Sequence, residues 1–115
     1  MEQTESEKAL EIAQLLEDGK AQDVVVLDVS ELNSWTNYFV IATVASSTLA
    51  QGLYRTVRDY VRTHDMAIHE AAHRHAPSPE WNLIDIGTVV VHLMSKDARD
   101  FYELEKLWHA GTKLR

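Results

Sequence analysis

The chain has 115 residues, of which 45% are hydrophobic and 25% charged, values that suit one soluble domain with a single core. It has no cysteine, which excludes disulfides and thiolate metal sites. Its net charge of −7 disfavours direct nucleic-acid binding and favours a basic protein partner. No apolar run approaches the ~20 residues that cross a bilayer, and the acidic N-terminal segment lacks signal-peptide character. We expect a cytoplasmic protein whose single domain spans residues 1–115.

The first quarter of the chain predicts a helix followed by a strand. Thr4 and Glu7 have the spacing of a capping box, and Gly19 is placed to end the helix. The β-branched run 24–29 predicts a central strand covered on both faces, and residues 38–43 predict a second strand. The expected apolar face of the helix comprises Ala9, Ile12, Ala13 and Leu16.

A second helix and three more strands are expected in the middle of the chain. Ser46 or Ser47 can cap the helix, and residues 66–69 suggest a short third strand. Both prolines fall in residues 71–80, which predict an exposed loop. Two apolar runs around a Gly-containing turn predict a β-hairpin over residues 81–94. The apolar face of this helix comprises Leu49, Leu53, Val57, Tyr60 and Val61.

A final helix is expected after the hairpin, with Ser95 as its cap and Gly111 as its end. Its buried face should comprise Phe101, Leu104 and Trp108. The element order α-β-β-α-β-β-β-α predicts an α/β or α+β domain: one mixed sheet of about five strands with helices on its faces. The second strand, second helix and third strand can form a right-handed crossover. The strand order is not predicted.

Five stretches of this sequence resemble the ribosomal silencing factor family, also called the Iojap-like family. They occur in the family's order with nearly its spacing, and the last two are specific when taken together. These stretches are residues 23–29, 38–43, 81–87, 89–92 and 99–108.

The resemblance implies a fold and a function. Family members have a nucleotidyltransferase-like shape without the activity. They bind a ribosomal protein on the subunit-joining face of the large ribosomal subunit, and so block association with the small subunit and repress translation under nutrient limitation. Organellar relatives take part in large-subunit assembly, which makes an assembly or biogenesis factor the alternative function. The family also suggests a homodimer.

Polar and aromatic residues near the hairpin and the final helix are the candidate partner-binding residues. Each has a plainer alternative: Trp81 can be a core or rim aromatic, Asp85 can cap the hairpin turn instead of pairing with a basic partner, and a histidine in His92's setting is more often a hydrogen-bonded sheet residue than a ligand. The helical residues can form an ordinary solvated face. The candidates are Trp81, Asp85, His92, Arg99, Tyr102 and Glu103.

The sequence departs from the family pattern at four positions: Asn37 and Thr88 stand where acids are usual, and Val44 and Ala71 stand where glycine is common. Val tolerates a positive φ poorly, so position 44 can alter the turn between strand and helix. Losing two acids can weaken contact with a basic partner.

The sequence gives little support for a metal site or for a catalytic site. His69, His73 and His75 lie close in sequence, but no predicted helix preorganises them for zinc, which favours a solvated loop. Metal-dependent nucleotidyl transfer needs carboxylates one residue apart on a strand, and neither Asp28 nor Asp85 has such a neighbour. We therefore expect no cofactor and no catalysis, with a metal-dependent nucleotidyltransferase as the third and weakest hypothesis.

Overall fold

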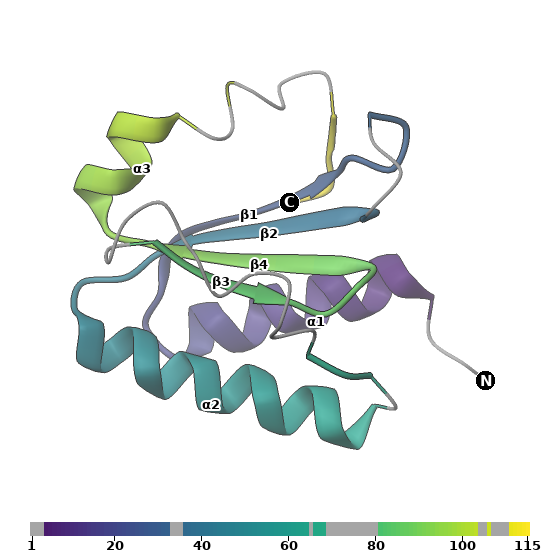
Figure 1. Ribbon diagram of the computed structural model, residues 1–115, viewed down its shortest axis with the longest axis horizontal. Helices are drawn as coiled ribbons and strands as arrows, with labels where there is room; N and C mark the ends of the chain where they lie inside the picture. The colour runs from purple at the N-terminus through teal and green to yellow at the C-terminus, as the bar shows by residue number, and fades with distance from the viewer. Residues whose placement is uncertain (1–3, 33–35, 65, 69–80, 104–105, 107–110) are drawn as a thin grey trace.

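The computed structural model describes residues 4–32, 36–64, 66–68, 81–103, 106 and 111–115. Its elements, in chain order, are α1 (Glu5–Asp18), β1 (Gln22–Asp28), β2 (Tyr38–Thr43), α2 (Ser47–Thr63), β3 (Trp81–Asp85), β4 (Val89–Met94), α3 (Lys96–Tyr102) and β5 (Thr112–Lys113). They form one α+β domain around a single five-stranded sheet. Figure 1 shows α1 and α2 side by side under one face of the sheet and α3 above the other.

The sheet is mixed, in the order β3-β4-β2-β1-β5. β2 and β4 pair in parallel, while β3 with β4, β1 with β2 and β1 with β5 pair antiparallel. The predicted fold class and the hairpin over residues 81–94 are therefore confirmed. Gly87 makes the hairpin turn possible, because its φ of 91° lies in a region that side chains disfavour.

The predicted third strand over residues 66–69 is wrong for its described part. Residues 66–68 adopt no strand; the Met66 amide donates to the Val61 carbonyl at 3.1 Å at the end of α2. The fifth strand is instead Thr112–Lys113, which pairs with the outer edge of β1. Two residues are too few to show strand alternation in a sequence. This strand is recognised only in the structure, where it covers an edge of β1 that would otherwise be unpaired. The parallel neighbour of β2 is accordingly β4.

β1 is an interior strand but not the central one. It lies between β2 and β5, its first two residues are exposed, and full burial begins at Val26. All six residues of β4 and nearly all of β2 are buried. β1, β2 and β4 have similar apolar sequences, so the hydrophobic pattern does not tell which of them is central. The order of the strands depends on which strands pair, and the pattern does not give that.

The two long helices form as their sequences predict. Thr4 and Glu7 make the capping box of α1, Gly19 is its C-cap, and the Ser46 hydroxyl caps α2. A Cβ on Gly19 would lie 2.6 Å from a methyl carbon of Leu53, so this glycine lets the end of α1 approach α2 closely. Their predicted apolar faces enter one core with the lower side of the sheet.

A hydrogen bond joins the two long helices at their polar margin. The Tyr60 hydroxyl on α2 donates to a Glu11 carboxylate oxygen on α1 at 2.5 Å. Burial raises the pKa of Tyr60, and the Glu11 carboxylate raises it further. Among the described residues, no helix has the length and apolar character that crossing a membrane requires.

Candidate functional site

Three of the six candidate residues form an aromatic cluster on the α3 side of the sheet. The ring centroid of Trp81, which opens β3, lies 5.8 Å from that of His92 on β4 and 4.9 Å from that of Tyr102 at the end of α3. Phe39 meets the His92 ring edge-on at 4.7 Å. Antiparallel pairing brings the start of β3 beside the end of β4, and α3 begins directly after β4, so short connections place the three rings together.

A hydrogen bond fixes the orientation of the Trp81 ring. The Trp81 Nε1–H donates to His92 Nδ1 at 3.1 Å, and His92 is 4% exposed. His92 is therefore a hydrogen-bonded residue of the sheet, which was its alternative in the sequence analysis, and it holds the Trp81 side chain in place. Trp81 itself is half-buried, and a tryptophan already held in one orientation loses little entropy when a partner covers it.

Phe101 is the main correction in this region. The sequence placed it on the buried face of the final helix, yet its side chain is 79% exposed and lies edge-on to Tyr102 at 5.0 Å. Buried Ala98 faces the sheet instead. The predicted helix is interrupted: α3 ends at Tyr102, because Glu103 adopts the left-handed conformation with φ 47°, and Lys106 is helical again. Leu104 and Trp108 lie outside the described residues.

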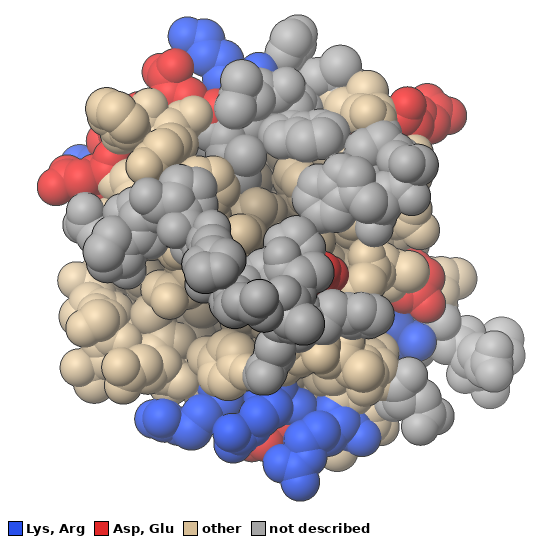
Figure 2. All heavy atoms as spheres, in the orientation of Figure 1, with Lys and Arg blue, Asp and Glu red and all other residues tan. Residues whose placement is uncertain are grey.

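Exposed acidic side chains lie close to Phe101 in the sequence of α3 and its cap. Asp97, Asp100 and Glu103 are all exposed on α3 or at its cap, and Figure 2 shows acidic side chains gathered where α3 lies. We call Trp81 and the α3 residues Asp97, Asp100, Phe101, Tyr102 and Glu103 the α3 surface. It combines aromatic anchors with negative charge, a composition suited to a protein partner with a basic face.

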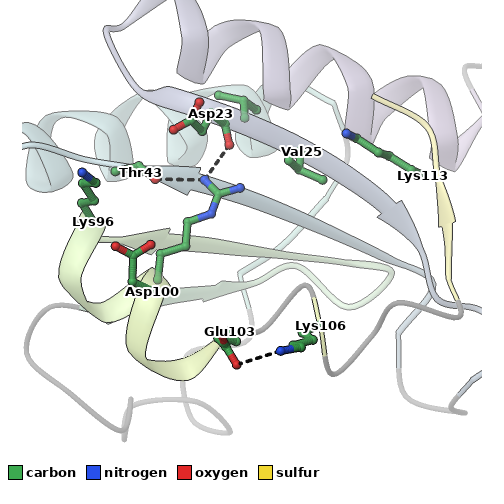
Figure 3. A pocket seen from close by; sticks show the side chains of 10 residues that line it. Asp23, Val25, Thr43, Lys96, Asp100, Glu103, Lys106 and Lys113 are labelled. Carbon is green, nitrogen blue, oxygen red and sulfur yellow. Dashed lines mark hydrogen bonds and ion pairs between the residues drawn. The ribbon is translucent and has the colours of Figure 1, made fainter.

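Arg99 lies on the other side of α3 and holds the helix to the sheet. Its Nη1 donates to the Asp23 carbonyl at 2.5 Å and to the Thr43 hydroxyl at 2.9 Å, as Figure 3 shows. Asp23 has φ 48° at an irregularity in the β1–β2 pairing, and this bulge presents its carbonyl to Arg99. The predicted solvated helix face therefore does not include Arg99. The sequence pattern around Arg99 does not indicate these two partners, because they lie 76 and 56 residues away along the chain.

A groove of about 840 Å³ opens beside Arg99, between α3 and the ends of β1 and β5. Both signs of charge line it, and Glu103 pairs with Lys106 at 3.7 Å across one wall (Figure 3). Its charged lining comprises Asp23, Lys96, Arg99, Asp100, Glu103, Lys106 and Lys113. With cations and carboxylates interleaved, the groove does not select one simple ion.

Asp85 lies away from the aromatic cluster. It ends β3, four residues from Trp81 and so roughly 13 Å along an extended strand. Its side chain is buried, at 8% exposure, and Oδ1 accepts from the Gly87 amide at 2.8 Å. The structure thus gives Asp85 the turn-capping role that was its alternative, and separates it from the α3 surface.

The departures from the family pattern are accommodated locally. Val44 has no positive φ; it is buried, and its amide donates to the Met94 carbonyl at 2.8 Å, so the strand-to-helix turn is unstrained. The Thr88 hydroxyl donates to Glu5 at 2.6 Å, and the Asn37 amide donates to the Thr88 carbonyl at 3.0 Å. Ala71 lies outside the described residues.

The metal hypothesis rests on His69, His73 and His75, which also lie outside the described part of the chain, as does the predicted loop 71–80. Within the described ranges, no group of three or more His, Cys, Asp or Glu side chains is placed to hold a metal ion.

Comparison with known proteins decides the family. Residues 2–115 match the model of the family described as "Ribosomal silencing factor during starvation". The chain belongs to the ribosomal silencing factor family. The "Ribosomal silencing factor RsfS" of Treponema pallidum is 36% identical over 97 residues, which cover 84% of this chain and 86% of that protein.

The fold of the silencing factor family is also seen in a solved relative. A crystal structure of a Chromobacterium violaceum protein is similar with a TM-score of 0.77 and 32% sequence identity, covering 92% of this chain and 88% of that one. A mouse relative named "Mitochondrial assembly of ribosomal large subunit protein 1" is 31% identical over 98 residues, 84% of this chain but 43% of the mouse protein. The family predicted from the five sequence stretches is confirmed.

Proposed function

We propose that this member of the ribosomal silencing factor family binds a basic ribosomal protein on the joining face of the large subunit and keeps the small subunit from docking. The observation that carries the proposal is the α3 surface: Trp81, held by its hydrogen bond to His92, beside Tyr102 and the exposed Phe101. Clustered aromatic side chains of this kind are typical centres of protein interfaces.

Charge supports a basic partner. The chain carries a net charge of −7, and the carboxylates Asp97, Asp100 and Glu103, on the same helix as Phe101 and Tyr102 or at its cap, are exposed. Complementary charge speeds encounter and fixes the orientation of the bound partner more than it adds affinity. In this arrangement the aromatic side chains supply the affinity and the carboxylates supply the choice of partner.

The proposed mechanism is steric exclusion. A standard interface buries about 800 Å² on each partner, roughly an eighth of the 6823 Å² surface of this chain. The rest of the domain, 39 Å in its longest dimension, then stands in the space that the small subunit needs. Occupancy alone is sufficient, so we propose a cytoplasmic, non-catalytic repressor without a cofactor, and a homodimer as its form when unbound.

Sedimentation with purified ribosomal particles tests this function. We expect the protein to bind isolated large subunits, to leave small subunits and intact ribosomes unbound, and to lower the yield of intact ribosomes when the subunits are mixed. Trp81→Ala should weaken binding about 30-fold or more, as for a hot-spot residue. Leu32→Ala removes another exposed hydrophobic side chain, away from the α3 surface, and should bind normally.

Charge reversal tests the basic partner separately. Asp97→Lys with Asp100→Lys should slow association with the large subunit, whereas Asp18→Lys with Glu31→Lys, which makes the same change in net charge at other exposed positions, should not. Equal binding to large subunits and intact ribosomes would rule out exclusion.

The alternative function is assembly of the large subunit, favoured by the printed name of the mouse relative. A deletion strain separates the two. Immature large subunits, with normal subunit joining in purified components, would favour assembly; mature subunits that join without restraint in starved cells would favour silencing.

A further inference from the structure

The two long helices of this acidic protein differ in charge. α1 carries five carboxylates and one lysine, whereas α2 carries three arginines and one aspartate. Figure 2 shows basic side chains gathered along the edge where α2 lies in Figure 1. The net charge of the whole chain therefore conceals a local positive region on α2.

The arginines form a strip along the exposed side of α2. Arg55, Arg58 and Arg62 are spaced by three and four residues, so they share one face over about 10 Å of helix. All three are exposed, and the side chain of Arg62 is 71% exposed. Asp59 approaches Arg58 and Arg62 at 3.9 Å each, but exposed pairs at this distance hold the arginines weakly. We call these three residues the arginine strip.

A polar groove of about 580 Å³ runs beside the arginine strip, between α2 and the edge strand β3. Hydroxyl, amide and guanidinium groups line it. Its polar lining comprises Ser47, Gln51, Tyr54, Arg55, Arg58 and Asn82. Arginine, serine, asparagine, glutamine and tyrosine side chains are the groups that contact phosphates and sugars in protein–nucleic acid complexes.

Gly52 is a second, independent feature of the same helix. Glycine inside a helix is destabilising relative to alanine, and no atom of the described residues explains it, because none lies within 4 Å of the position a Cβ would take. It lies one turn before Arg55 and next to Gln51. A missing side chain at this point leaves room for another molecule to approach the helix backbone.

We propose that the arginine strip and its groove bind the sugar–phosphate backbone of RNA, without reading the bases. The inference rests on the proposed function, which places the protein on a particle made largely of RNA. The α3 surface would hold the ribosomal protein while α2 contacts neighbouring RNA phosphates. The sequence-based argument against nucleic-acid binding rested on total charge, and it does not apply to a local strip of one sign.

RNA fits this surface better than a protein or a membrane. A protein interface needs an apolar centre, but the exposed large hydrophobic side chains of the described residues are Leu32, Phe101 and Leu114, none of them on α2. A membrane-surface helix needs its apolar face free, and the apolar face of α2 is packed in the core.

Binding to a protein-free RNA oligonucleotide tests the proposal at several salt concentrations. Three neutralised phosphates give a slope of about −2 in log affinity against log salt for a single strand. Arg55→Gln with Arg62→Gln should bring the slope to about −0.7. Lys8→Gln with Lys20→Gln removes the same charge from other elements and should leave the slope unchanged. Gly52→Ala should raise the melting temperature while weakening RNA binding several-fold.

Each other outcome overturns the proposal. Equal weakening by both double variants would show that only total charge matters, and tighter binding to polyglutamate or to phosphatidylserine vesicles than to RNA would assign the strip to another partner. The proposed function is tested separately by sedimentation. If the protein sediments with large subunits and its Arg55→Gln, Arg62→Gln variant does so equally well, the RNA contact alone is refuted. RNA binding without large-subunit binding refutes the function alone.

Discussion

The two faces of the sheet differ in the helices that cover them and in the side chains of their cores. The lower face is covered by α1 and α2, with 14 and 17 residues, and its core is almost entirely aliphatic. The upper face carries the seven residues of α3 among those described, and its cluster includes Phe39, Trp81 and Tyr102 around buried His92. Among the described residues, the cluster on the lower face is therefore the larger of the two cores, and the cluster on the upper face is the smaller and more aromatic one.

The contrast extends to charge. The α3 surface joins aromatic rings to carboxylates, while the arginine strip of α2 joins cations to a polar groove. A small domain lying between a basic protein and RNA phosphates needs one surface of each sign. The arginine strip is not apparent from the net charge, which averages over both surfaces.

The largest expected effect tests the lower face as the folding core. Ile12 on α1 is fully buried against the sheet and α2, so Ile12→Ala should lower the free energy of unfolding by about 2–5 kcal/mol. Phe101→Ala on α3 removes a larger side chain that is 79% exposed and should change it by no more than about 0.5 kcal/mol. Urea unfolding of both variants measures the contrast, and equal losses would contradict it.

Arg99 tests whether α3 depends on its link to the sheet. Arg99→Ala leaves the Asp23 carbonyl and the Thr43 hydroxyl without their shared donor, and should cost about 1–2 kcal/mol, discounted for partial exposure. Hydrogen exchange should show the loss in α3 before α1. Arg99→Lys keeps the charge but not the planar fork, so it should recover only part of this stability; full recovery would show that charge alone acts here.

The elements on the lower face were predicted from the sequence more accurately than those on the upper face. Capping residues and helical spacing placed α1 and α2 correctly, because local patterns determine long helices. The hairpin followed from Gly87 and its flanking apolar runs. Phe101 was misplaced because the small residue Ala98, a weak apolar signal, is the one that is buried, and because no capping glycine marks the end of α3 at Glu103. Arg99 was misread because its partners are distant in sequence.

The site was predicted unevenly for the same reason. Trp81, His92 and Tyr102 were named as polar and aromatic residues near the hairpin and the final helix, and the structure brings them together. Asp85 was named with them as a residue of the same hairpin, but closeness in sequence does not give its distance from Trp81 along the strand. The arginine strip was overlooked because total charge, a property of the composition, was applied to the whole surface.

Tyr60 tests the polar margin of the lower face through pH. Its raised pKa means that the folded protein keeps the phenol proton longer than the unfolded chain. The stability from this group is present below the unfolded pKa of about 10 and is lost as pH rises above it. Tyr60→Phe should cost about 1 kcal/mol at neutral pH and should unfold with a weaker alkaline pH dependence. An unchanged alkaline slope in the variant would show that other groups cause it.

The smallest effect concerns the junction between the hairpin and α1. The Thr88 hydroxyl donates to Glu5 at 2.6 Å, and Thr88→Val, which keeps the shape, should cost about 0.5–1 kcal/mol in urea unfolding. Thr88→Asp restores the acid usual in the family, but here it would set two carboxylates in contact, so it should be less stable than Thr88→Val, and the difference between the two should shrink in high salt. A more stable Thr88→Asp would mean that Glu5 does not stay at this position, and that the junction, unlike the core beneath it, is free to rearrange.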